Sequence, residues 1–418
     1  MTDRITHMAA AAKAASRIVA TLDTETKRTV LRAVASAVDA KRPDILHANA
    51  EDLEVAHADG LADAKLQRLG LDDAKLDRLC EGVRQIAGMA DPVGAQTMSR
   101  EVPSGLRVRK VRAPLGVIAM IYEARPAVTI DAFALCFMSG NACILKGGRE
   151  ANRSNHALAE IARAVLSEHG APADAMNAFT SSEREDLRHL LSLSDSIDLV
   201  IPRGGEALIR FVAENSRIPT IQHYKGVCHA YIDEHADIEM AANIVVTAKT
   251  SAPATCNALE CALVHEAVAP AFLKALGARI PSDMKVRAEA HVIKTLDESM
   301  TWLESAKPDD WGREYLDTVL ALRIVTDMDQ ALEHIATYSS SHTECIVTND
   351  ASAAERFCRE VQSSCVLVNA STRFNDGFEL GLGAEIGIST SRIHAYGPMG
   401  LEELTTQRYV VTGTGQTR

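Results

Sequence analysis

Cys256 is the residue of this sequence whose surroundings best suit covalent chemistry. It lies in the run TCNALE, after the small polar stretch KTSAPA at 249–254, which predicts a loop, and before CALVH at 261–265, which predicts a buried strand. A cysteine attacks as a thiolate, so it needs a partly exposed, polar setting. The alternative is a packed thiol, because free cysteines are among the residues most often buried. The run nominates Cys256 as a nucleophile from nine cysteines.

Two glycine pairs follow predicted strands and suit a phosphate group. Ligands gather at the carboxyl ends of parallel strands, and backbone amides at a helix start favour anions. The first turn also carries two cations, so phosphate binding is preferred there to a solvated turn. The second lacks the G-x-G-x-x-G spacing, and an ordinary tight turn is an equal alternative. The residues are Lys146, Gly147, Gly148 and Arg149 in KGGRE, and Gly204 and Gly205 in PRGGEALIRF.

The segment IYEARP places Glu123 and Arg125 directly after a predicted buried strand. An arginine can hold a carboxylate with two hydrogen bonds, so both residues are candidates for substrate contact. The alternative is an ion pair that fixes the loop. His223 and His229 lie in HYKGVCH, but no H-E-x-x-H pattern is present, and no metal site is expected. No G-x-S-x-G is present either, which removes the main signal of a serine hydrolase.

Composition excludes several classes of protein. The 418 residues carry a net charge of -12 with no dense basic run, which disfavours nucleic-acid binding. Nine cysteines without a C-x-x-C pair fit neither a disulfide framework nor a structural zinc site, and indicate a reducing compartment. No apolar run is long enough to span a membrane. We therefore expect a cytoplasmic protein without a membrane partner.

The chain predicts a helical lead-in over residues 1–100 and then two α/β units. A two-faced strand and a buried strand are expected within 106–122. Apolar runs alternate with helical segments, which is typical of parallel sheets with crossover helices. A final strand in RYVVTG is expected to pair with another element or subunit. The other predicted strands lie at 143–146, 197–201, 228–233, 261–265, 344–348 and 365–369, and the helices near 127–139, 150–168, 205–215, 237–249, 267–279 and 351–362.

Five segments together give the sequence a closer resemblance. They are VRAPLGVIAMIYEARPAVTIDA, SGNACILKGGREA, LVIPRGGEALI, TCNALE and GLGAEIGISTSRIHAYGPMGLEELTT. In this order they resemble the glutamate-5-semialdehyde dehydrogenases, also called gamma-glutamyl phosphate reductases, of the aldehyde dehydrogenase superfamily. The resemblance implies NADPH-dependent reduction of L-glutamyl 5-phosphate, the second step of proline biosynthesis, by a phosphorylating aldehyde dehydrogenase with Cys256 as nucleophile.

The resemblance also implies roles for other residues. Aldehyde-oxidising relatives carry a water-activating glutamate where this chain has HYKGVCH, so a thioester on Cys256 could survive. Their oxyanion-binding asparagine aligns with Ala124, which leaves Asn257 or the Cys256 amide as donor. Arg149 replaces a ribose-binding glutamate and favours NADP, while Glu314 matches the glutamate that holds the nicotinamide ribose. Arg125 and Lys225 are expected to bind the substrate's phosphate or α-carboxylate.

The resemblance further implies a Rossmann-like cofactor domain, an α/β catalytic domain and a small β oligomerisation element. We assign the cofactor domain to 1–102 and 114–227, the catalytic domain to 228–378, and the oligomerisation element to 103–113 with 390–418. A homo-oligomer is expected, and contact with a glutamate 5-kinase is open. The alternatives are a CoA-linked or hydrolytic aldehyde dehydrogenase, or a nucleotide-binding module without catalysis.

Overall fold

The chain folds into two compact units. The computed structural model describes residues 2–181, 183–290, 293 and 302–418. Unit 1 comprises Met1–Gln222, Gly381–Gly387 and Met399–Arg418, and unit 2 comprises His223–Leu380 and Ile388–Pro398. The main boundary follows Gln222 rather than residue 227 as predicted. The segment from His223 to Val227 is therefore grouped with Cys256.

Unit 1 begins with amphipathic helices, as the sequence predicts. In α2, Asp23 caps the first turn by accepting a hydrogen bond from the Thr26 amide at 2.7 Å. Val30, Leu31 and Val34 lie on one face of this helix and are fully buried. The five helices are α1 (Thr2–Val19), α2 (Thr24–Ala40), α3 (Arg42–Ala58), α4 (Asp63–Leu69) and α5 (Asp73–Gly88).

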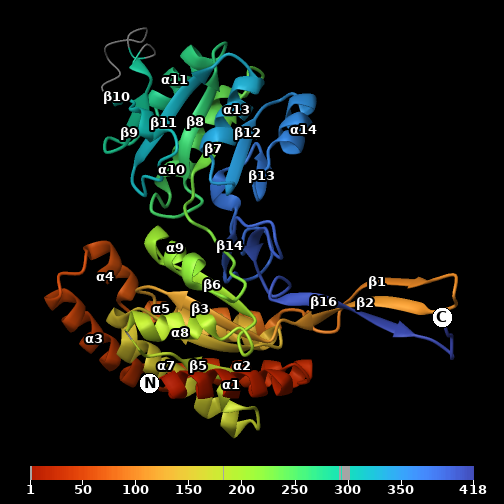
Figure 1. Ribbon diagram of the computed structural model, residues 1–418. Coiled ribbons are helices and arrows are strands. Elements are labelled where there is room, and N and C mark those ends of the chain that lie inside the picture. The colour runs from red at the N-terminus through yellow and green to blue at the C-terminus, as the bar shows by residue number, and fades with distance from the viewer. Residues whose placement is uncertain (1, 182, 291–292, 294–301) are drawn as a thin grey trace. The chain divides into compact units, whose positions relative to one another are not determined.

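The core of unit 1 is a parallel four-stranded sheet in the order β5-β4-β3-β6. All six residues of β3 are buried, which explains its continuous apolar run. Helix α6 joins β3 to β4, α7 joins β4 to β5, and α8 joins β5 to β6 (Figure 1). The elements are β3 (Val117–Tyr122), α6 (Val128–Met138), β4 (Ala142–Lys146), η1 (Arg149–Ala151), α7 (Asn152–Glu168), η2 (Ala173–Ala175), β5 (Met176–Ala178), α8 (Arg184–Ser192), β6 (Leu199–Arg203) and α9 (Glu206–Asn215).

A second, three-stranded antiparallel sheet extends away from the rest of unit 1 (Figure 1). It consists of β1 (Gln96–Glu101), β2 (Arg107–Pro114) and β16 (Thr405–Thr412). The β2 strand pairs with β16 along its whole length, from Thr405 opposite Pro114 to Thr412 opposite Arg107. The helical lead-in thus ends at Gly88, and the prediction of helical structure up to residue 100 is wrong for β1.

Unit 2 is built on a parallel seven-stranded sheet in the order β10-β9-β11-β8-β7-β12-β13. Side chains alternate between its faces: Ala230 and Ile232 pack under α10 and α11, whereas Tyr231 packs under α13 and α14. The elements are β7 (Cys228–Ile232), α10 (Ile238–Thr250), β8 (Leu259–His265), α11 (Ala269–Gly277), β9 (Lys285–Ala288), β10 (Leu303–Ser305), η3 (Pro308–Asp310), β11 (Val319–Val325), α13 (Met328–Tyr338), β12 (Thr343–Val347), α14 (Ala351–Glu360), β13 (Cys365–Val368) and η4 (Thr372–Phe374).

Two short strands complete the fold, β14 (Gly387–Ser389) and β15 (Gly397–Met399), which pair with each other. They lie where the chain passes between the two units. Among the described residues, no helix is both long enough and apolar enough to cross a membrane.

Candidate active site

Cys256 lies in the loop that joins α10 to β8 in unit 2. Its side chain is partly exposed. The loop packs tightly against Gly226, because a Cβ atom added there would lie 1.9 Å from the carbonyl oxygen of Cys256. The glycine of HYKGVCH thus allows the two backbones to approach. The position at the edge of a buried strand agrees with the prediction from TCNALE.

The remaining cysteines offer different surroundings. Burial raises the pKa of six thiols. It raises the pKa of Cys345 to about 12 and that of Cys365 to about 11. The other four are Cys80, Cys143, Cys228 and Cys261. Desolvation disfavours a thiolate, so these thiols are poor nucleophiles at neutral pH. Cys358 is exposed on α14.

Asn257 is buried, and its side chain ties the Cys256 loop to the segment after β13. Its Nδ2 donates to the backbone oxygens of Asn375 at 3.0 Å and Arg373 at 3.3 Å, and its Oδ1 accepts from Arg373 Nη1. Thr372 Oγ1 donates to the Asn257 carbonyl at 2.8 Å. The amide hydrogens of Asn257 are engaged within the protein. This side chain anchors the loop, and the prediction that it donates to an oxyanion is at odds with these contacts.

Arg373 is a cation beside the loop that carries Cys256, and its local sequence gives no sign of this position. Its Nη1 donates to Thr255 Oγ1 at 2.8 Å and to Asn257 Oδ1, which are both uncharged groups. Its Nε is buried and has no hydrogen-bond partner among the described residues. A buried donor of this kind normally has a partner, so the site suits an anionic ligand.

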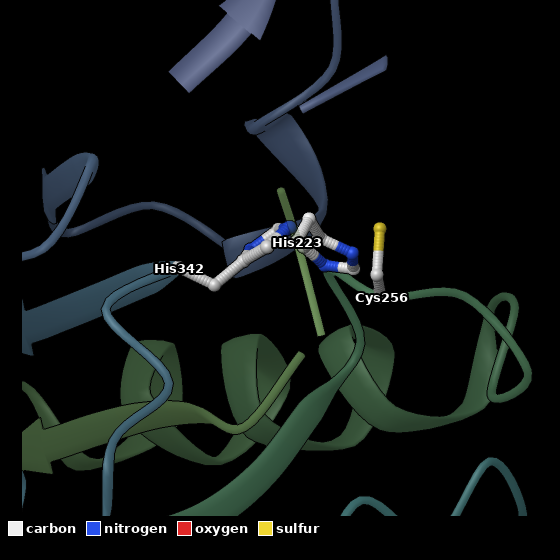
Figure 2. A group of neighbouring side chains, drawn as sticks. All are labelled: His223, Cys256 and His342. Carbon is white, nitrogen blue, oxygen red and sulfur yellow. The ribbon is translucent and has the colours of Figure 1, made fainter. Parts of the chain in front are cut away.

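Two histidines lie next to the Cys256 sulfur (Figure 2). One ring nitrogen of His223, one of His342 and the sulfur all lie within 4.8 Å of one another. The two rings are edge to face, with centroids 4.9 Å apart. His223 precedes β7, and His342 directly precedes β12. The sheet therefore gathers residues from positions 223, 256 and 342 of the chain.

His342 is fixed from its other side. The residue is fully buried, and its Nδ1 lies 2.6 Å from Thr343 Oγ1 and 3.7 Å from Cys228 Sγ. The Cys228 thiol in turn donates to the Cys256 carbonyl at 3.3 Å. These contacts hold the imidazole and the nucleophile's loop in one framework.

Glu314 and Lys225 border the same part of unit 2. Glu314 Oε1 accepts a hydrogen bond from the Gly226 amide at 2.8 Å, and Lys225 Nζ donates to the Gly312 carbonyl at 2.8 Å. Gly226 therefore contacts both the Glu314 carboxylate and the backbone of Cys256. The roles predicted for these two residues remain predictions.

The first glycine turn ends β4 in unit 1. Lys146 is partly buried, its Nζ donates to the Gly147 carbonyl at 2.9 Å, and burial lowers its pKa. Arg149 is 76% exposed and makes a distant ion pair with Asp59 at 3.7 Å. The turn packs closely, because a Cβ on Gly147 would lie 1.9 Å from Asn155 Nδ2 and one on Gly148 would meet the Glu150 carboxylate at 2.0 Å.

The second glycine turn and the IYEARP segment lie side by side in unit 1. Glu123 Oε2 accepts from the Gly205 amide at 3.4 Å, and a Cβ on Gly204 would lie 3.0 Å from the Glu123 carboxyl carbon. A Cβ on Gly205 would have no atom within 4 Å, so open space borders the start of α9. Arg125 is exposed.

Ala124 has a positive φ of 42°, and its amide donates to Glu150 Oε1 at 2.7 Å. The contact explains how a residue without a glycine's freedom holds this backbone conformation. The methyl side chain cannot donate a hydrogen bond, in agreement with the sequence comparison.

Comparison with known proteins places the chain in a class and then in a subgroup. The model of the aldehyde dehydrogenase family matches residues 2–292, so the chain belongs to this family, whose members use a nicotinamide cofactor. Within it, the chain is 52% identical over 412 residues to the gamma-glutamyl phosphate reductase of Sorangium cellulosum, covering 97% of this chain and 96% of the relative. It is 50% identical over 415 residues to that of Xylella fastidiosa strain M12, covering 99% and 94%.

A solved structure agrees. The crystal structure of gamma-glutamyl phosphate reductase from Thermotoga maritima matches with a TM-score of 0.95 and 37% identity over 99% of each chain. The chain is thus a member of the gamma-glutamyl phosphate reductase group, which confirms the resemblance and the aldehyde dehydrogenase-like α/β fold predicted from the motifs.

Proposed function

We propose that this chain reduces L-glutamyl 5-phosphate to L-glutamate 5-semialdehyde and releases phosphate. The observation that carries the proposal is the partly exposed Cys256 on a loop beside two imidazoles, in a chain half identical to gamma-glutamyl phosphate reductases. The neighbouring His223–Gly226 segment has no carboxylate that could activate water. An acyl group on Cys256 is therefore better suited to transfer to phosphate than to water.

The covalent step uses the Cys256 sulfur. The thiolate attacks the acyl carbon, the carbon–oxygen bond to phosphate breaks, and phosphate leaves with the bonding electrons. A thioester remains on Cys256. When bound, NADPH supplies the hydride for its reduction. Cys256 then leaves as a thiolate when the carbon–sulfur bond breaks and the aldehyde forms, so the sulfur needs no net proton.

The oxyanion of this chemistry needs donors other than the Asn257 side chain. Ala124 has none to offer, and the Asn257 amide is bound to the 373–375 backbone. One ring nitrogen of His223 and one of His342 lie within 4.8 Å of the sulfur, and in the tautomer that carries hydrogen there each can donate to an oxygen on the attacked carbon. Such donors are commonly worth about 3 kcal/mol in the transition state.

Arg373 is our candidate for the substrate's α-carboxylate. Its guanidinium contacts the residues on both sides of Cys256, and its buried Nε lacks a partner among the described residues. A carboxylate would satisfy that donor with a charge-assisted hydrogen bond. Lys225 and Arg125 keep their predicted role as ligands of the phosphate or carboxylate, and Glu123 its predicted substrate contact, although its carboxylate already binds the Gly205 amide.

The unit 1 turns fit NADPH. An exposed cation at a strand end, Arg149, suits the 2′-phosphate, and the partly buried ammonium of Lys146 lies three residues earlier. The open space beside Gly205 at the start of α9 suits a pyrophosphate, because backbone amides at a helix start favour anions. Glu314 is proposed to hold the nicotinamide ribose.

The acceptor assay tests the proposal in the reverse direction. Full-length protein, glutamate 5-semialdehyde and NADP are mixed with phosphate, with CoA or with neither, and NADPH formation is followed. We expect formation that depends on phosphate and falls below a few percent in Cys256→Ser but not in the exposed control Cys358→Ser. An equal rate of NADPH formation with water alone would favour a hydrolytic aldehyde dehydrogenase, and an equal rate with CoA a CoA-linked one. The absence of any NADPH formation would favour a nucleotide-binding module without catalysis.

We also propose a cytoplasmic homo-oligomer. The supporting observation is that β16 is an edge strand of its sheet and carries the exposed apolar side chains Tyr409 and Val411. Contact with a glutamate 5-kinase would shorten the path of the labile acyl phosphate and stays a prediction.

A further inference from the structure

The group around Cys256 has the composition of a metal site. His223 and His342 offer two imidazole nitrogens and Cys256 one sulfur, and all three atoms lie within 4.8 Å of one another. Zn²⁺ prefers this mixture of imidazole and thiolate. No short sequence motif predicts this group, because its members lie far apart in the sequence, at positions 223, 256 and 342.

The distances nearly suit tetrahedral coordination. Ordinary zinc–sulfur and zinc–nitrogen bonds place neighbouring ligand atoms about 3.3–3.6 Å apart. Atoms within 4.8 Å therefore need shifts on the order of 1 Å, which rotation of the Cys256 and His223 side chains can supply. Both are partly exposed, so both have room to turn.

The third ligand is already oriented. Thr343 Oγ1 and Cys228 Sγ lie beside Nδ1 of the buried His342, which leaves Nε2 as its coordinating atom. Metal-bound histidines commonly have their second nitrogen held by such a partner. Gly226 and the Asn257 anchor fix the backbone that carries Cys256.

Unit 2 contains a second group of two histidines and one cysteine, which serves as a comparison for the group at Cys256. His229, Cys261 and His334 also lie within 4.8 Å of one another, but all three are buried. Arg323 Nη1 lies 3.0 Å from His334 Nδ1, and His229 Nδ1 lies 3.0 Å from Glu344 Oε2. A cation beside a ligand and the lack of exposure oppose entry of a metal ion. The group at Cys256 differs in exposure, since Cys256 and His223 are both partly exposed.

We propose that His223, Cys256 and His342 form an inhibitory zinc site. Zn²⁺ takes the two imidazole nitrogens and the thiolate, with water in the fourth position, and displaces the thiol proton where the sulfur carries one. No electron transfer is involved. The bound sulfur shares one of its lone pairs with the metal and is a weaker nucleophile, so it attacks an acyl phosphate or an alkylating reagent more slowly. The inhibition rests on the proposed function, whereas the binding does not.

Direct metal titration of the full-length protein tests the site. Co²⁺ serves as an optical probe and Zn²⁺ as its competitor, in the absence of substrate. We expect one Co²⁺ per chain, a sulfur-to-cobalt charge-transfer band that Zn²⁺ removes, and slower alkylation of Cys256 when Zn²⁺ is present. Cys256→Ser should lose the band, and His223→Gln and His342→Gln should each weaken binding at least 10-fold.

Matched variants keep the result interpretable. Cys261→Ser changes the buried group and Cys358→Ser the exposed thiol, and both should bind Co²⁺ as the parent does. Near-ultraviolet circular dichroism identifies any variant that fails to fold, and in that case the parent protein's charge-transfer band and alkylation protection decide. Binding that survives both histidine substitutions, or an absence of the band in the parent, would overturn the site. Zinc binding without reductase activity would leave it standing and reject the proposed function instead.

Discussion

Cys256 is distinguished from the other cysteines by what surrounds its sulfur. Six thiols have pKa values raised by burial, whereas Cys256 is partly exposed and lies beside two imidazoles. The loop is held by the close contact with Gly226 and by the bonds of Asn257 to the 373–375 backbone. The nucleophile is thus positioned by backbone packing, while its reactivity is set by neighbouring side chains.

Arg373→Gln should separate substrate binding from chemistry. If Arg373 holds the α-carboxylate, the loss of a charge-assisted hydrogen bond should raise KM for glutamate 5-semialdehyde roughly 10- to 100-fold, with a smaller effect on kcat. Arg373→Lys should recover part of the loss. Steady-state kinetics of the phosphate-dependent reverse reaction measure both constants.

The control for Arg373 is an aldehyde of equal length without the α-carboxylate. Its KM should be high in the parent protein and nearly unchanged in Arg373→Gln. A loss of the same size for both aldehydes would mean that Arg373 only braces Thr255 and Asn257, and the assignment would fail.

The residues found only in the structure share a physical reason. Cys256 was predictable because its own loop and the following strand reveal its setting. Arg373 and His342 lie near it only because β13 and β12 belong to the same parallel sheet as β8. Nothing in their local sequence indicates which loop they will meet. The anchoring contacts of Asn257 were unpredictable for the same reason, since its partners are more than a hundred residues away.

At the scale of elements, the turn after β4 should set the choice of cofactor. Arg149→Glu replaces an exposed cation by a carboxylate that repels a 2′-phosphate and can bind ribose hydroxyls. The ratio of kcat/KM for NADPH to that for NADH should fall at least 10-fold, which corresponds to about 1.4 kcal/mol. The comparison variant is Arg84→Gln, an exposed arginine of α5. An unchanged ratio in Arg149→Glu would remove Arg149 from the cofactor site.

The packing of α6 predicts a pH dependence of stability. Burial raises the pKa of Asp131 from 3.8 to about 7. Between about pH 4 and pH 7 the unfolded state loses this proton while the folded state keeps it, so the free energy of unfolding should fall as pH rises. Above pH 7 the penalty should be constant and less than about 4 kcal/mol.

Asp131→Asn removes this penalty. It should stabilise the protein at pH 8 and flatten the decline between pH 4 and 7, as followed by urea unfolding at several pH values. The exposed Asp195→Asn serves as the comparison. A parent profile that rises across this range, or a variant with the same slope, would contradict the assignment.

The secondary structure was largely predictable where apolar runs were long. Strands β4, β7, β8, β12 and β13 lie close to their predicted positions, as do helices α6, α7, α9, α10, α11 and α14, whereas α8 and α13 were not predicted. The β6 strand continues through Pro202 to Arg203, since the parallel pairing with β3 extends that far. The predictions omit β11, although Val319–Val325 is apolar enough to be found, and the short β5, β9 and β10, which lack a signal of their own.

At the scale of the whole molecule, the resemblance across the five motifs predicted the fold more fully than periodicity could. Periodicity indicates two α/β units but cannot tell that Gly381–Gly387 and Met399–Arg418 return to unit 1. The resemblance grouped residues 103–113 with 390–418 in one element, and β2 and β16 from these segments pair, whereas the additional strand β1 was not predicted. Its role in assembly stays a prediction.

The central claim is that Cys256 carries a thioester which phosphate, rather than water, removes. Rapid mixing of the protein with glutamate 5-semialdehyde and NADP, without phosphate, tests it most directly. We expect a burst of about one NADPH per chain, followed by little further turnover until phosphate is added, and no burst in Cys256→Ser. Continuous NADPH formation without phosphate, or a burst of the same size in Cys256→Ser, would rule out a thioester on Cys256 that only phosphate removes.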